Sequence, residues 1–205
     1  MQMNYKILII MLVMSAGLYG FTQPENKHHR KNKRVDIVDV MDNQIHQLLV
    51  QLNEEFDTYE NNNPQKGYCV TINTKGSLQG KITPHGGRRS TKLLSDMPEN
   101  ELIYKEKCPF CKYAKNKSDS CFLKDFHDQS YAVTSLSNQI LVIPQEHYTH
   151  LFTAPFDMQV IIIKNMLAMR SQHPEKIERP MEFHCGSAAG QTVFHLHGRT
   201  GLYIK

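Results

Sequence analysis

Two long stretches of the chain predict helices: in the first, apolar residues recur every three or four positions, which is the spacing of one face of an α-helix, and the second is strongly apolar. The first stretch runs from residue 35 to residue 59, with apolar positions at Val38, Met41, Ile45, Leu48, Leu49, Leu52 and Phe56. The second runs from Pro155 to about Arg170, with apolar positions at Met158, Ile161, Ile162, Ile163, Met166, Leu167 and Met169. Both are predicted to be helices that pack on a core, and the methionines favour core packing over a binding surface.

Shorter apolar runs bounded by turn-forming residues predict strands. They cover residues 68–72, 130–136, 139–143, 182–185 and 193–199, and Ser137–Asn138 predicts a hairpin turn between the second and the third. A helix is predicted after Cys108, and a loop-rich stretch from residue 73 to residue 100. Antiparallel strands with one long crossing helix predict an α+β fold, preceded by an N-terminal extension of one helix and loops.

The last predicted strand carries the most informative side chains. In an extended segment His195, His197 and Arg199 share one face at a spacing of roughly 7 Å, while Phe194 and Leu196 point to the other. Two imidazoles and a guanidinium in a row suit a phosphate, and an imidazole can act as a nucleophile. The alternative is that both are ordinary strand histidines.

Three sequence blocks decide between these interpretations. The stretch from His184 to His197, HCGSAAGQTVFHLH, resembles the active-site block of the histidine-triad (HIT) superfamily, Asn-x-Gly-x-x-x-Gly-Gln-Ser/Thr-Val-x-His-x-His-x-His. LVIPQEH at residues 141–147 is similar to the family's Val-Ile-Pro-Lys-x-His segment, and CPFC at residues 108–111 to the Cys-x-x-Cys of zinc-binding members. The resemblance covers residues 105–205 and implies a HIT-like antiparallel sheet.

The resemblance implies a nucleotide hydrolase or nucleotidylyl transferase whose middle histidine, His197, attacks an α-phosphate and forms a nucleotidyl-histidine. The substrate would be a nucleotide or a nucleotide sugar. We expect four residues of the block and one that follows it to bind the phosphate: His184, Gly190, Gln191, Thr192 and Arg199.

Two positions depart from the family pattern. His184 stands where the family has Asn, and Arg199 stands where it has the third His. The ending HLHGR is also close to the His-x-His-x-Gln of the branch that includes galactose-1-phosphate uridylyltransferases and dinucleoside-polyphosphate phosphorylases. Because a guanidinium cannot transfer a proton, the alternative function is a catalytically impaired module that binds zinc and nucleotide.

Cys108 and Cys111 are spaced to hold one metal ion from a single turn, and zinc needs two further ligands. The resemblance implies that these are His147 and His195, with zinc in a structural role. His150 could replace His147, and the two thiols could instead form a redox pair. The polar residues 101–107 argue against the redox pair, because such a motif follows a buried strand.

The remaining sequence features concern possible partners, disulfides and the oligomeric state. A formal charge of +4 without an aromatic-interleaved basic stripe does not favour nucleic acid as a partner. Five cysteines exclude a complete disulfide framework. Gly86–Arg89 could approach a phosphate, although a solvated turn is the simpler interpretation. HIT-like domains commonly pair, which leaves a homodimer open, with the N-terminal region as a candidate cover for the pairing surface.

The N-terminus has the pattern of an export signal. Lys6 precedes an almost wholly apolar stretch, residues 7–18, and residues 1–20 are therefore predicted to be a signal peptide of an exported protein, secreted or periplasmic. The basic linker 21–34 opposes translocation, so an uncleaved membrane anchor and a cytosolic protein are the alternatives. Residues 35–104 would form the extension and 105–205 the HIT-like domain.

Overall fold

The computed structural model describes residues 37–62, 67–75, 77–84 and 105–204, and residues 36–205 form one compact unit. The predicted signal segment, the basic linker and the Gly86–Arg89 turn lie outside the described residues. Within the described part, no helix combines the length and the apolar character needed to span a bilayer.

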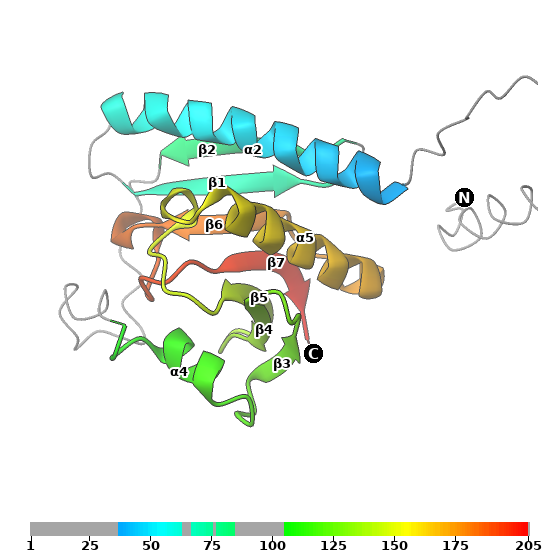
Figure 1. Ribbon diagram of the computed structural model, residues 1–205, viewed down its shortest axis with the longest axis vertical. Helices are drawn as coiled ribbons and strands as arrows, with labels where there is room; N and C mark the ends of the chain where they lie inside the picture. The colour runs from blue at the N-terminus through cyan, green and yellow to red at the C-terminus, as the bar shows by residue number, and fades with distance from the viewer. Residues whose placement is uncertain (1–36, 63–66, 76, 85–104, 205) are drawn as a thin grey trace, which may run out of the picture. The chain divides into compact units, whose positions relative to one another are not determined.

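Seven antiparallel strands form one sheet in the order β2-β1-β6-β7-β5-β4-β3 (Figure 1). Their bounds are β1 Tyr68–Asn73, β2 Gln79–Pro84, β3 Phe122–Asp125, β4 Ser130–Thr134, β5 Gln139–Pro144, β6 Met181–Cys185 and β7 Gly198–Tyr203. The α-helices are α2 Ile37–Asn62, α4 Pro109–Lys115 and α5 Phe156–Gln172, and three short 3-10 helices cover Leu151–Thr153, Pro174–Lys176 and Ser187–Ala189. The predicted α+β fold is confirmed.

Helices α2 and α5 cover the same face of the sheet (Figure 1). Their apolar stripes, which include Leu49, Leu52, Ile162 and Met166, pack with alternate strand residues in the main core. Helix α4 packs on the opposite face, where Tyr131 of β4 and Leu141 and Ile143 of β5 form a second, smaller core. Because β4 and β5 bury side chains on both faces, their residues alternate between the two cores.

The predicted extension shares the sheet with the predicted HIT-like region. Strand β1 pairs with β6 from Tyr68↔Cys185 to Ile72↔Met181, and β2 pairs with β1. The boundary at residue 105 therefore does not separate two sheets. Strand β1 covers the edge that β6 would otherwise present.

Two strand predictions were wrong. Strand β2 lies within the stretch predicted to be loop-rich, and its composition hides it because Ile82 is its buried apolar residue at an edge of the sheet. The strand predicted at 193–199 begins only at Gly198. Before it the chain bends, since the His195 N–H donates to the carbonyl of Val193 and the Leu196 N–H donates to that of Tyr148. These bonds replace the ladder that a strand would need.

Candidate functional site

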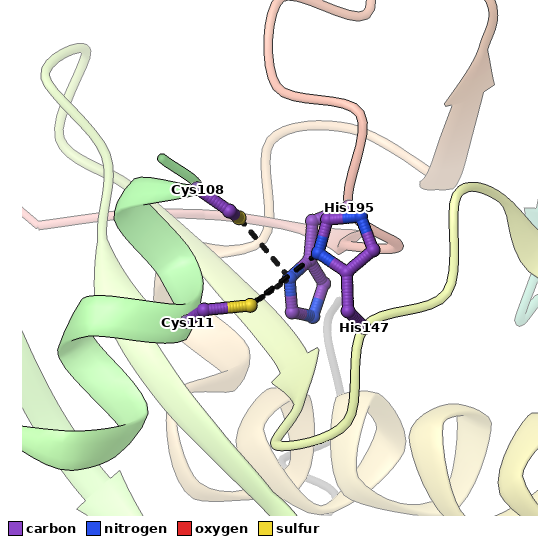
Figure 2. A group of neighbouring side chains, drawn as sticks. All are labelled: Cys108, Cys111, His147 and His195. Atoms are coloured by element: carbon purple, nitrogen blue, oxygen red, sulfur yellow. Dashed lines mark hydrogen bonds between the residues drawn. The ribbon is translucent and has the colours of Figure 1, made fainter. Parts of the chain in front are cut away.

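The four residues predicted as metal ligands come together at one end of α4 (Figure 2). Cys108 is the N-cap of this helix and Cys111 lies in its first turn, so both thiols leave the same short segment. His147 follows β5, and His195 is the last residue of the bend before β7. One ligand atom from each residue lies within 4.8 Å of the other three.

The distances within this cluster fit a tetrahedral metal. Cys108 Sγ lies 3.3 Å from His195 Nδ1, and Cys111 Sγ lies 3.3 Å from His147 Nδ1 and 3.5 Å from His195 Nδ1. Ligand bonds of the lengths zinc makes to sulfur and nitrogen place two tetrahedral donors about 3.5 Å apart. The set is a Cys2His2 cluster that can bind a metal ion.

The protonation of the cluster also suits a metal. His195 Nε2 lies 3.0 Å from the carbonyl oxygen of Pro144; because that oxygen can only accept, Nε2 carries the hydrogen and Nδ1 keeps a lone pair toward the thiols. Burial, with the charge of His147, lowers the pKa of His195 to about 4, so the ring is neutral. Burial raises the pKa of Cys111 to about 12, so without a metal that thiol holds its proton.

The two alternatives for these residues do not fit the structure. His150 lies outside the cluster, because its Nδ1 is 2.9 Å from the hydroxyl of Tyr68, and burial lowers its pKa to about 4. The redox alternative requires a strand directly before Cys108, but residues 105–107 form a turn. All five cysteines are free.

His197 lies beside a cavity of about 460 Å³ rather than in the metal cluster. Its Nδ1 lies 2.8 Å from the carbonyl oxygen of His195, so Nδ1 carries the hydrogen and Nε2 keeps the lone pair. Burial, followed by the positive charge of Arg199, lowers the pKa of His197 to about 3. The ring is 6% exposed and neutral, yet it lines the cavity.

The cavity has mostly apolar walls and one charged lining residue, Arg199. Gly190, Thr192 and His197 line the same cavity. Val133 and Leu141 form part of the apolar wall. The hydroxyl side chains of Thr134, Ser135 and Ser137 and the exposed side chain of Leu136 also line the cavity. Burial lowers the pKa of Arg199 from its ordinary value, while the charge of Glu182 opposes that shift.

A tight loop places Gly190 and Thr192. Gly186 and Gly190 have φ values of +87° and +79°, which side chains other than glycine rarely adopt. The Gln191 side chain holds this loop: its Oε1 accepts from the Gly186 N–H at 2.8 Å, and its Nε2 donates to the Thr149 carbonyl at 2.7 Å. Gln191 was predicted to contact phosphate. In the structure, both ends of its side-chain amide form hydrogen bonds with backbone groups instead.

His184 lies on β6, where its Nε2 is 3.3 Å from Glu182 Oε2. Its Nδ1 is on the side of Gly190, 3.9 Å from where a Cβ on that residue would lie. Glu182 was missed at the sequence level, although strand alternation puts it on the face of His184. Phe110 was also missed as a site residue: its ring packs edge-on against both His195 and His197, with centroids 5.8 and 5.3 Å apart.

Comparison with solved structures finds a HIT family hydrolase from Clostridium thermocellum, 30% identical, with 45% of this chain and 87% of that protein covered and a TM-score of 0.39. A GalT-like protein from Arabidopsis thaliana is 15% identical over 75% of this chain and 56% of its own, with a TM-score of 0.48. A uridylyltransferase mutant is 15% identical over 83% and 62%, also with a TM-score of 0.48. This chain thus spans less than two thirds of each of the latter two proteins. No family model and no curated protein matches the chain.

Proposed function

The chain belongs to the histidine-triad (HIT) family, and we propose that it acts on a nucleotide or nucleotide sugar at the α-phosphate, through a covalent nucleotidyl-histidine on His197. The tautomer of His197 carries this proposal. Its Nδ1 is held by the His195 carbonyl at 2.8 Å, which leaves Nε2 as the nucleophilic nitrogen of a ring that lines the cavity.

The reaction has two balanced steps. His197 Nε2 attacks the α-phosphorus, and the bond from phosphorus to the leaving oxygen breaks. Water, inorganic phosphate or a sugar phosphate then attacks the same phosphorus, and the electrons of the P–N bond return to Nε2. Arg199 and the loop at Gly190 and Thr192 stabilise the phosphate oxygens, and His184 lies beside Gly190. Gln191 contributes by holding the loop.

The cavity accounts for the nucleoside part of such a substrate. Its volume of about 460 Å³ falls among those of small-molecule sites. The apolar side chains of Phe110, Val133 and Leu141 suit a base, and the hydroxyls of Thr134 and Ser135 suit a sugar. One charged end and one apolar wall fit a molecule with phosphate at one end and a ring system at the other.

The metal in this proposal is zinc, held by Cys108, Cys111, His147 and His195. Two thiols and two imidazoles are ligands that zinc prefers in structural sites. The bound ion would clamp α4 to the segment that carries His197, and the Phe110 ring of α4 packs edge-on against both histidines of that segment. The four ligands would hold the ion in a structural role that supports the position of His197, outside the bond changes.

A second candidate function is a binding module with the same cavity and metal but without turnover. The observation in its favour is Arg199, which occupies the third histidine position and cannot transfer a proton. The two candidates differ in whether the P–N bond forms.

A trapping experiment decides between them. The protein is incubated with α-labelled nucleoside polyphosphates, nucleotide sugars and dinucleoside polyphosphates, and the acid-labile adduct is measured after denaturation. We expect an adduct that is absent in His197→Ala and present in His127→Ala, a matched control because His127 is an exposed histidine in the β3–β4 turn. Binding of the same probes without adduct or turnover would favour the module.

A further inference from the structure

A row of titratable side chains crosses the centre of the sheet on the face opposite α2 and α5. Met181, Phe183 and Cys185 of β6 point into the main core, so the alternate residues Glu182 and His184 point to the other face. Their neighbours are fixed by register: Cys69 of β1 pairs with His184, and Arg199 of β7 pairs with Glu182. The row joins the proposed phosphate site through Arg199, which lines the cavity.

The ring of His184 is oriented by Glu182. The carboxylate can only accept, so at 3.3 Å it receives the hydrogen of Nε2. The other nitrogen, Nδ1, lies on the side of Gly190, a cavity-lining residue. His184 itself is not among the residues that line the cavity, so it reaches the site from behind Gly190.

Departure of an alkoxide and attack by water each need a proton transfer that the other residues of the site do not supply. His197 uses Nε2 for the phosphorus and Nδ1 for the His195 carbonyl. Arg199 stays protonated and can only stabilise charge. A leaving oxygen that departs as an alkoxide has to be protonated as its bond to phosphorus breaks.

We propose that His184 is the acid–base residue of this site and that Glu182 positions it, an inference that rests on the nucleotidyl transfer proposed above. In the first step the imidazolium of His184 gives its Nδ1 proton to the leaving oxygen as the P–O bond breaks. In the second step neutral His184 takes a proton from the attacking water as the P–O bond to that water forms and the P–N bond breaks. The imidazolium is thereby restored.

The groups around His184 are one anion, one cation and two neutral side chains. The hydrogen bond from His184 lowers the pKa of Glu182, so that carboxyl is an anion that accepts from the ring. Arg199 lies next to Glu182 across the strands. Burial raises the pKa of Cys69, so its thiol is neutral, and His197 is neutral as well.

The test compares two esters of adenosine 5′-monophosphate that differ in their need for a proton. A p-nitrophenyl ester releases a stable phenolate, whereas a methyl ester releases an alkoxide. Adduct formation on His197 is measured in a single turnover with each ester. We expect His184→Gln to slow the methyl ester about 100-fold or more and the p-nitrophenyl ester less than about tenfold. His127→Gln, the same change on an exposed histidine, should alter neither.

Glu182→Gln tests the positioning role with the same two esters. Without the carboxylate the His184 ring loses the acceptor that orients it, so this variant should slow the methyl ester more than the p-nitrophenyl ester. An unchanged methyl-ester rate would overturn the role of Glu182.

Equal slowing of both esters in His184→Gln, with a His197-dependent adduct in the unsubstituted protein, would overturn the inference and leave the proposed function standing. Absence of any His197-dependent adduct with the p-nitrophenyl ester would overturn both. Metal content and melting temperature are measured for each variant, and His184→Asn serves as the second variant if His184→Gln does not fold. The same selective loss is expected from it, because an amide cannot donate and regain this proton.

Discussion

Two histidines two residues apart, His195 and His197, perform different tasks because opposite ring nitrogens are fixed. His195 donates Nε2–H to the Pro144 carbonyl and turns Nδ1 to the thiols. His197 donates Nδ1–H to the carbonyl of His195 and keeps Nε2 as its lone-pair nitrogen. The His195 ring completes the Cys2His2 cluster, and the His197 ring lines the cavity. The backbone carbonyl that each ring meets, rather than the residue type, decides which nitrogen is available.

The largest expected effect is a loss of activity without a loss of metal, in a variant of His197. His197→Ala removes the nucleophile, and turnover of the best substrate in the panel should fall by at least about 10⁴-fold. Metal content and melting temperature should stay near those of the unsubstituted protein, because His197 is not in the cluster. Steady-state rates measure the turnover, and elemental analysis measures the metal content. Loss of metal in His197→Ala would mean that the two ends of the site are not separable.

The next effect separates them by stability. Cys108→Ser removes a thiolate ligand, so the chain should lose its metal, about one ion per molecule, and roughly 3 kcal/mol of unfolding free energy. For a chain of this size that is a fall of about 10 °C in melting temperature. Elemental analysis and calorimetry check it. Cys121→Ser is the matched control, since Cys121 lies outside the cluster; equal metal in both variants would remove Cys108 from the ligand set.

A smaller effect, on kcat/KM, is expected from a change at Arg199, which lines the cavity. Arg199→Lys keeps a positive charge but loses the planar pair of donors, so kcat/KM should fall about tenfold. We expect Arg179→Lys, at a site outside the cavity lining, to leave kcat/KM unchanged. Full activity of Arg199→Lys would show that this side chain does not contact the phosphate.

The smallest effect concerns His150, which belongs to neither end. Its pKa is lowered to about 4 by burial, so between pH 6.5 and 4 the unfolded chain takes up a proton that the folded protein does not. The free energy of unfolding is therefore complete above about pH 6.5 and falls as the pH is lowered through this window. From pH 7 to pH 5 the unsubstituted protein should lose about 2 kcal/mol more than His150→Gln. Urea unfolding at both pH values measures this, and equal losses would contradict the prediction.

Much of the fold could be predicted because its signals are local. The apolar stripe of α2, the long apolar run of α5 and the short apolar runs of β4 and β5 are visible in the chain itself. Strand β2 could not be found, since an edge strand that buries Ile82 has no such period. The bend at 193–195 could not be found either. It depends on a backbone bond from Leu196 to Tyr148, a residue far away in the sequence.

The sequence by itself determined which residues could do chemistry. The spacing of Cys108 and Cys111 and the family resemblance of the blocks at 141–147 and 184–197 named the candidate metal ligands and the proposed nucleophile before any geometry. Tertiary structure alone decided how those side chains are used. It chose His147 over His150, turned His195 and His197 apart, committed Gln191 to the backbone, and placed Glu182 beside His184. The reason is physical: hydrogen bonds and burial set by distant segments select a tautomer and a direction, and no local pattern encodes them.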